Sequence, residues 1–393
     1  MRRKPSVAFV IFIVLSFFAN KGFAQINADA PVRIAVLAPL YLDSAFVNDE
    51  LKYNSSLPKY MLPGLDFYNG VMMAVDSMQK ENVEVEVWVY DTRKKGQTVE
   101  DLEHEMEEQN FSLIIASISN VAEQQSLSSF AFNKNIPFIS ATYPNDAGIS
   151  SNPFFIIVNS TLKTHVESIY DYVQRNYVGD KVYYVTRKGQ MEERIKNYFD
   201  AMKSKTYPLK YKTIVLPDNF TAANLLPLID STTESVVICG SLDENFGLNL
   251  VHILSTAPSS NQLTAVGMPT WEGLKELWKD DCRNVNLVFS TPYHFDHTDN
   301  VIAQLTSLYQ AKFNNHPGDM VFKGFEEMYH FTHLLLVYKN SLPNNLSDHS
   351  FKIANDFDFQ PVRLSTSSYV PDYLENKKVY FVKLLNGSVI SIN

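Results

Sequence analysis

Short apolar runs alternate with amphipathic stretches along most of this chain. Apolar residues recur at helical spacing between the runs, as Val166, Ile169, Tyr170 and Val173 do. Runs with the length and apolar content of buried strands cover 33–40, 83–90, 112–118, 136–140, 153–159, 181–186, 211–217, 235–240, 263–268 and 286–291. This alternation predicts an α/β fold of doubly wound parallel sheets with helices on both faces.

The last hundred residues break the alternation. Two helical segments, 300–315 and 322–340, follow one another without a strand between them. The tail 378–392 then has the pattern of a β-hairpin, with Asn386-Gly387 as a favourable turn dipeptide.

The first residues have the pattern of a secretory leader. Basic residues at positions 2–4 precede an apolar run of 12 residues, Val7 to Phe18, and small residues at 22 and 24. The run is short of the ~20 residues that span a bilayer. We predict a signal peptide over 1–24, with cleavage before Gln25. No Cys stands directly after that point, and no later run is apolar enough to cross a membrane, so the predicted location is periplasmic or secreted without a lipid anchor.

Charge and cysteine content narrow the function classes. The net charge is −9, and it becomes −13 without the leader, which carries four basic residues and no acid. Such an acidic chain is not expected to bind nucleic acid through a broad basic patch. Cys239 ends an apolar run and is expected to pack as a small hydrophobe. Cys282 lies in a polar segment, and two cysteines allow at most one disulfide.

The segment "LIIASISN", 113–120, places hydroxyl side chains where a buried strand gives way to a helix. A nucleophile elbow needs glycines around the serine, and a phosphate loop needs a Gly-rich turn; residues 115–125 contain no Gly. We therefore expect neither a catalytic serine nor a nucleotide site. Asn120 and Glu123 have the spacing of a helix N-cap and its capping-box partner.

Two other groups of residues have open or weak functional interpretations. His294, Asp296, His297 and Asp299 lack the spacing of known metal sites, and we interpret them as a polar loop after a strand. The long loop 41–68 is rich in tyrosine and phenylalanine. Its aromatic rings are equally compatible with stacking on a ligand and with covering the edge of the sheet.

The order of these features resembles the type I periplasmic binding proteins, in particular the branched-chain amino-acid (Leu/Ile/Val) binding branch. The resemblance covers about 31–390. It rests on the order and spacing of "VRIAVLAPL", "GLDFYNGVMMAVDSM", "VEVWVYDTR", "NIPFISAT", "NPFFIIV", "STPYHFD" and "HPGDMVFKGFEEMYHF".

The resemblance implies two α/β lobes joined by three crossovers, near 155–160, 290–294 and 358–363. The N-terminal lobe would comprise 31–155 plus 294–360, and the C-terminal lobe 156–293 plus 361–393. In this fold the ligand lies at the carboxyl ends of the strands, and the lobes close around it by hinge motion.

The resemblance also implies ligand contacts at matching positions of this chain. They are Tyr41, Ser117, Ser119, Thr142, Tyr143, Gln190, Ser241 and Trp271 in the 269–271 loop. The amino-acid binders use hydroxyls for the ligand carboxylate and an acid near position 269 for the ammonium, where this chain has Met268-Pro269-Thr270-Trp271 with Glu272 as the nearest acid. A Tyr is usual at the position of Gln190.

The implied function is an extracytoplasmic solute-binding protein, without cofactor, metal or enzymatic activity. It would hold a small polar ligand, such as an amino acid, for an ABC permease or a membrane sensor. An alternative is an envelope protein-interaction or regulatory module of the same fold, without a transported ligand. A hydrolase would need a His and a carboxylate converging on Ser117 or Ser119.

Overall fold

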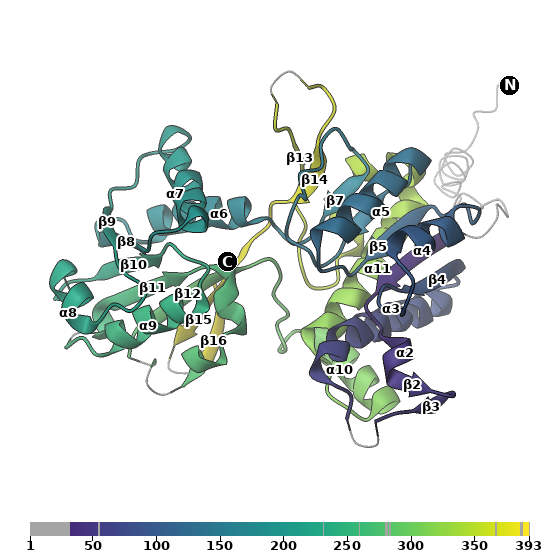
Figure 1. The fold of residues 1–393 in the computed structure, drawn as a ribbon, viewed down its shortest axis with the longest axis horizontal. Helices are drawn as coiled ribbons and strands as arrows, with labels where there is room; N and C mark the ends of the chain where they lie inside the picture. The colour runs from purple at the N-terminus through teal and green to yellow at the C-terminus, as the bar shows by residue number, and fades with distance from the viewer. Residues whose placement is uncertain are drawn as a thin grey trace, which may run out of the picture.

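The computed structural model describes residues 32–53, 56–230, 232–258, 260–279, 282, 284–365, 368–385 and 388–392. The predicted signal peptide and the Asn386-Gly387 turn lie outside these residues. The chain forms two halves that lie side by side and are linked at the centre (Figure 1). Each half is built on a 7-stranded sheet, and we refer to the halves as the first and the second lobe.

One edge of the sheet in the first lobe is formed by two strands from near the C-terminal end of the chain. From that edge, the strand order runs β13 (Phe359–Val362), β14 (Tyr373–Asn376), β7 (Phe155–Ile157), β6 (Phe138–Ser140), β5 (Leu113–Ala116), β1 (Val32–Ala38) and β4 (Val85–Asp91). All neighbours pair in parallel except β13 with β14. The helices of this lobe are α3 (Leu62–Lys80), α4 (Val99–Met106), α5 (Val121–Lys134), α10 (Asn300–Phe313) and α11 (Asp319–Tyr338).

The second lobe repeats this plan. Its order is β16 (Ser388–Ile392), β15 (Tyr380–Leu385), β12 (Asn286–Thr291), β11 (Leu263–Gly267), β10 (Ser235–Cys239), β8 (Lys181–Thr186) and β9 (Lys212–Val215). The strands from β12 to β9 are parallel, and β15 and β16 add an antiparallel hairpin. Its helices are α6 (Leu162–Asn176), α7 (Gln190–Ala201), α8 (Ala222–Leu225) and α9 (Glu244–Ser255). The doubly wound parallel fold and all ten strands predicted from apolar runs are confirmed.

Alternate residues of the central strands enter different hydrophobic cores. In β1, Ile34 and Val36 pack into one core of the first lobe, whereas Ala35 and Leu37 pack into the core on the other face. In β10, Cys239 joins one core and is fully buried, as expected for a small hydrophobe. Burial on both faces explains why these strands are apolar throughout rather than alternating with polar residues.

One predicted crossover is wrong. Strands β13 and β14 belong to the first sheet, where Leu374 pairs with Ile156. The chain therefore passes to the second sheet between Asn376 and Tyr380, and not at 358–363. The two strands have the sequences "FQPV" and "YLEN", in which a proline and polar residues interrupt the apolar signal that identified the other strands.

Two long helices of the first lobe cross at close range. A Cβ atom added to Gly324 of α11 would lie 2.2 Å from the Phe67 carbonyl oxygen of α3, and one on Gly70 of α3 would lie 2.0 Å from the Val321 oxygen. Both neighbours are backbone atoms of helices. Only glycine permits this approach of α3 and α11.

Gly324→Ala is therefore expected to destabilise the protein. Alanine favours a helix by about 1 kcal/mol over glycine, but overpacking against a fixed backbone costs about 3 kcal/mol, so the clash dominates. Thermal unfolding should show a lower midpoint for Gly324→Ala. The control is Gly273→Ala, because nothing lies within 4 Å of an added Cβ there. Equal midpoints for both variants would contradict the close crossing.

Candidate functional site

The carboxyl ends of the parallel strands are where ligands bind in open α/β sheets. At the end of β4, Asp91 is buried and its carboxylate accepts N–H bonds from Leu40 (2.9 Å), Tyr41 (3.1 Å) and Leu42 (2.8 Å). These bonds hold Tyr41 in the left-handed region, with φ of 57°, at the start of the short helix α2 (Leu42–Ala45). The Tyr41 ring packs edge-on against Tyr60 at 5.0 Å between centroids.

The end of β5 carries the two predicted serines. Ser117 is buried, with 5% of its surface exposed, whereas Ser119 is exposed. Asn120 caps α5, because its side-chain oxygen accepts the Glu123 N–H at 3.0 Å, as predicted. The capping-box partner behaves differently: the Glu123 carboxylate forms an ion pair with Arg93.

Arg93 is the central charged residue of this edge, and the sequence interpretation did not include it. It follows β4 directly, in the quoted segment "VEVWVYDTR". Its Nη1 donates to the Thr92 carbonyl at 2.9 Å and to Glu123, and its Nη2 donates to the Ser119 Oγ at 3.0 Å. The hydrogen bond to Glu123 raises the pKa of Arg93. The Tyr41 side chain is a further hydrogen-bond partner of this guanidinium, whose five N–H donors exceed the three that bond to Thr92, Glu123 and Ser119.

Thr142 and Tyr143 lie beyond β6 and have structural contacts. The Thr142 Oγ1 donates to the Ile118 carbonyl at 2.7 Å, and its own carbonyl accepts from Asn159 Nδ2 at 2.8 Å. Tyr143 is half-buried against the core on one face of the first sheet. These bonds tie the ends of β5, β6 and β7 together.

A second arginine occupies the corresponding edge of the second lobe. Arg187 follows β8, and its Nε donates to Glu192 at 2.7 Å while Nη1 donates to Asp218 at 3.1 Å. Its Nη2 makes no hydrogen bond within the described part of the chain. The predicted residue Gln190 is exposed, at the start of α7.

Ser241 acts on this arginine indirectly. Its side chain is fully buried, and its Oγ donates to the Glu192 carboxylate at 2.7 Å. Although burial opposes ionisation, the bonds from Arg187 and Ser241 lower the pKa of Glu192. The expected direct ligand contact of Ser241 is therefore replaced by a positioning role, in which Ser241 orients Glu192 and Glu192 orients Arg187.

The expectation that Trp271 contacts a ligand is wrong. Its side chain is 1% exposed and belongs to the hydrophobic core of the second lobe. A Cβ on Gly267 would lie 2.0 Å from the ring, and one on Gly247 would lie 2.7 Å from its Nε1. Glycine at these two positions makes room for the indole.

The neighbouring acid, Glu272, lies where the two lobes approach each other. It accepts a hydrogen bond from the Thr291 Oγ1 at 2.9 Å. Glu272 is exposed to solvent, but the protein around it partly desolvates its carboxyl and, together with the charge of Asp319 on α11 of the first lobe, raises its pKa to about 7. The pKa of Asp319 is also raised by desolvation. A carboxylate of the first lobe thus disfavours ionisation of a carboxyl of the second lobe.

The polar loop after β12 is accounted for by turn and helix-capping contacts. Asp296 accepts from Thr298, and Asp299 caps α10 by accepting the Val301 N–H at 2.7 Å. Among the described residues, no group of three or more His, Cys, Asp or Glu side chains could hold a metal ion. Within the same residues, no helix has the length and apolar content to cross a bilayer.

Comparison with known proteins identifies the fold. No family model matches the chain, and no curated protein matches its sequence. A putative branched-chain amino acid ABC transporter protein from Rhodospirillum rubrum superposes with a TM-score of 0.67 at 11% identity, over 92% of this chain and 100% of that one. LivJ from Streptococcus pneumoniae, in complex with isoleucine, gives 0.52 at 15% identity over 92% and 100%.

A third solved structure shows that proteins with similar folds also bind ligands other than amino acids. The solute-binding protein of an ABC transporter from R. palustris, in complex with benzoate, superposes with a TM-score of 0.52 at 12% identity, over 92% of this chain and 96% of that one. The chain has the type I periplasmic binding protein fold, which confirms the resemblance seen in its sequence. At these identities the likeness defines the fold alone.

Proposed function

We propose that this protein is an extracytoplasmic solute-binding protein that closes its two lobes around a small ligand bearing a carboxylate. The observation that carries this proposal is the presence of one oriented, partly exposed arginine at the carboxyl ends of the strands in each lobe. Arg93 is held by Glu123 and Arg187 by Glu192, and the Nη2 of Arg187 makes no hydrogen bond with the described residues. The planar guanidinium matches a carboxylate in two-pronged hydrogen bonding. Isoleucine and benzoate, bound by two structural neighbours, both carry this group.

A ligand ammonium group fits the opposite side of the site. The charge of Asp319 disfavours ionisation of Glu272, and a ligand ammonium beside the two carboxylates would offset that repulsion. A molecule with a carboxylate and an amine, such as an amino acid, satisfies both the arginines and these acids. We therefore propose Arg93, Ser119, Arg187 and Glu272 as ligand-contacting residues, with Tyr41, Thr142, Tyr143 and Gln190 around them.

The contacts of the serines oppose a hydrolase. The Ser119 Oγ is bonded to a guanidinium, which stays protonated and cannot act as a general base. Ser117 lies buried behind it. A binding protein of this kind would act in the periplasm or outside the cell and would deliver its ligand to an ABC permease or a membrane sensor.

Thermal-shift screening of the purified protein tests the proposal. A panel of amino acids, aromatic and aliphatic carboxylates, short peptides and neutral sugars is added one compound at a time. A specific ligand raises the unfolding midpoint by mass action, by about 2.7 kcal/mol of stability at one hundred times its Kd. Amino acids or other carboxylates should be the compounds that shift the midpoint. A response confined to compounds without a carboxylate would overturn the ligand class.

A second candidate function rests on exposed apolar side chains beside α2. Leu42, Phe46, Val47, Leu51 and Tyr60 are all exposed and lie on α2, the small hairpin β2 (Phe46–Val47) and β3 (Glu50–Leu51), and the segment before α3. Such apolar patches favour protein contacts, as in an envelope-interaction module. This function gains support if no small molecule shifts the midpoint while Val47→Ser/Leu51→Ser abolishes association with isolated envelope membranes.

The raised pKa of Glu272 predicts a pH-dependent affinity for an amine-bearing ligand. An ammonium binds the ionised carboxylate, whose fraction grows from about one tenth at pH 6 to about nine tenths at pH 8 for a group with a pKa near 7. Affinity should therefore rise about tenfold between these pH values. Calorimetric titration of Glu272→Gln should show weaker binding with a flat pH profile, and an unchanged profile would exclude Glu272 as the ammonium partner.

A further inference from the structure

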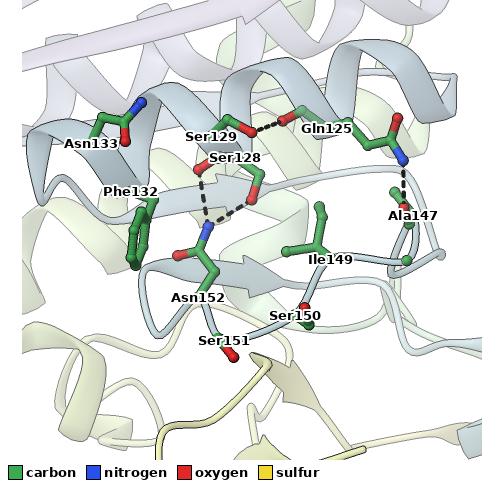
Figure 2. Close-up of a pocket in the computed structure, with 11 residues that line it drawn as sticks. Gln125, Ser128, Ser129, Phe132, Asn133, Ala147, Ile149, Ser150, Ser151 and Asn152 are labelled. Carbon is green, nitrogen blue, oxygen red and sulfur yellow. Dashed lines mark hydrogen bonds between the residues drawn. The ribbon is translucent and has the colours of Figure 1, made fainter.

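A groove of about 530 Å³ lies on the first lobe between α5 and the loop 147–152. Figure 2 shows Gln125, Ser129 and Phe132 on the helix side and Ile149, Ser150 and the residues after it on the loop side. Its volume falls within the ~300–1,000 Å³ typical of ligand pockets.

The groove is distant from the strand ends that carry the arginines. The loop 147–152 immediately precedes β7, so it lies at the amino edge of that strand. The helical wall, 125–133, runs from the second turn of α5 to its last turn, and so leads away from Asn120 at the carboxyl edge of β5. The groove is therefore separate from the proposed ligand site.

The two walls are fixed to each other. Asn152 is buried and donates to the Ser128 carbonyl (3.0 Å) and to its Oγ (2.8 Å), and Gln125 Nε2 donates to the Ala147 carbonyl at 2.8 Å (Figure 2). The loop is also anchored to the segment before β14, since the Asp372 carboxylate accepts the Ser151 N–H at 2.8 Å. The shape of the groove is thus set before any ligand binds, which lowers the entropic cost of binding.

The lining combines polar and apolar side chains and carries no charge. None of the eleven lining residues is ionisable, in a chain of which 20% of residues are charged. The Asn133 amide and the Ser150 hydroxyl have no hydrogen-bond partner among the described residues, and each can donate and accept. Phe132 is 46% exposed. Its ring packs against that of Phe154 in an edge-to-face arrangement, with 6.4 Å between the ring centroids.

We propose that this groove binds a neutral saccharide. A sugar ring has an apolar C–H face that stacks on an exposed aromatic ring, and its hydroxyl groups act as donors and acceptors at once. Phe132 supplies the stacking surface, and Asn133, Ser150 and the free side of Gln125 supply the hydrogen bonds. The absence of charge in the lining selects against ionic ligands, because nothing there compensates their desolvation.

Titration of the purified protein with cellotetraose, maltotetraose and chitotetraose tests this site. Calorimetry or NMR shift mapping should detect binding of at least one of them. Phe132→Ala should weaken that binding at least tenfold, and Ser150→Trp, which fills the groove from an exposed position, should abolish it. Phe313→Ala is the matched control, because Phe313 is an exposed phenylalanine on α10, outside the groove. Arg93→Ala should leave saccharide binding unchanged, which separates this site from the proposed carboxylate site.

Two results would overturn the proposal. One is that the unaltered protein binds none of the three tetrasaccharides at millimolar concentration and neither cellulose nor chitin. The other is that a saccharide binds with equal affinity to Phe132→Ala and Ser150→Trp. Binding of polymeric cellulose or chitin with loss of affinity in the same variants would identify an insoluble glycan, rather than a free oligosaccharide, as the source of the ligand.

Discussion

Arg93→Ala is expected to weaken binding of the carboxylate ligand by about 10–100-fold. The substitution removes the charged donors that face the ligand, and hydrogen bonds to charged groups contribute about 1.5–3 kcal/mol, with each 1.4 kcal/mol changing Kd tenfold. Arg93→Lys should give an intermediate loss, because an ammonium keeps the charge but lacks the planar pair of donors. The Kd is measured by calorimetry with the compound that gives the strongest thermal shift.

Arg33→Ala provides a matched control for this prediction. Arg33 also pairs with a glutamate, Glu86, through Nε at 2.7 Å, and is also partly exposed. It lies at the amino end of β1, whereas Arg93 follows the carboxyl end of β4. The control should keep full affinity. Because Arg93→Ala leaves the buried Glu123 without its ion partner, the unfolding midpoint without ligand is measured too. An affinity loss equal in both variants would exclude a ligand contact for Arg93.

The strands could be predicted because burial on both faces leaves a continuous apolar run. Residues 113–116 and 236–239 have such runs, and each is fully buried in the sheet. The edge pair β13 and β14 could not be found this way, since it carries Pro361, Glu375 and Asn376. The side chains of Glu375 and Asn376 bond to residues 158–164, where the chain enters the second lobe. Polar residues needed for these bonds interrupt the apolar pattern of a strand.

The site was predicted less completely, for a related reason. Position in the sequence indicated correctly that Ser119 stands at a strand end. It gave no information about how far a side chain at such a position is exposed to solvent. Trp271 and Ser241 follow strands in the same way and are nevertheless buried. The sequence does not single out Arg93, because an arginine after a strand is common on protein surfaces. What distinguishes Arg93 is its ion pair with the buried Glu123 of α5. This pairing becomes visible only when the sheet brings the ends of β4 and β5 together.

The connection between the lobes contains a buried carboxylate, Glu375, that bonds to both lobes. Glu375 lies next to the last residue of β14 in the first lobe and is 1% exposed. Its Oε1 accepts the Thr161 N–H at 2.8 Å and the Thr164 Oγ1–H at 2.6 Å, at the beginning of α6 in the second lobe. Lys377 donates to its other oxygen. Glu375 thus caps α6, whose own N-cap residue makes no side-chain bond.

Glu375→Ala is expected to be the most destabilising of these substitutions. Removing one member of a buried ion pair costs about 3–5 kcal/mol, and the lower value applies here because Lys377 is partly exposed and can be rehydrated. Thermal unfolding should show a midpoint lower by roughly 6–12 °C, given about 2–4 °C per kcal/mol for lobes of this size. Glu375→Gln should lose less, since an amide oxygen can still accept from Thr161. Glu108→Ala, at an exposed glutamate, is the control.

The pH dependence distinguishes a capping carboxylate from a loss of packing. Burial opposes ionisation of Glu375, but Lys377, Thr164 and Thr161 outweigh it and lower the pKa. A carboxylate with a lowered folded pKa stabilises the protein above the unfolded value of about 4.3, and this contribution disappears as the pH falls through the folded pKa. The midpoint difference between the unaltered protein and Glu375→Gln should therefore be full at pH 7 and shrink below pH 4. A constant difference across this range would show that the side chain contributes shape rather than charge to the link between the lobes.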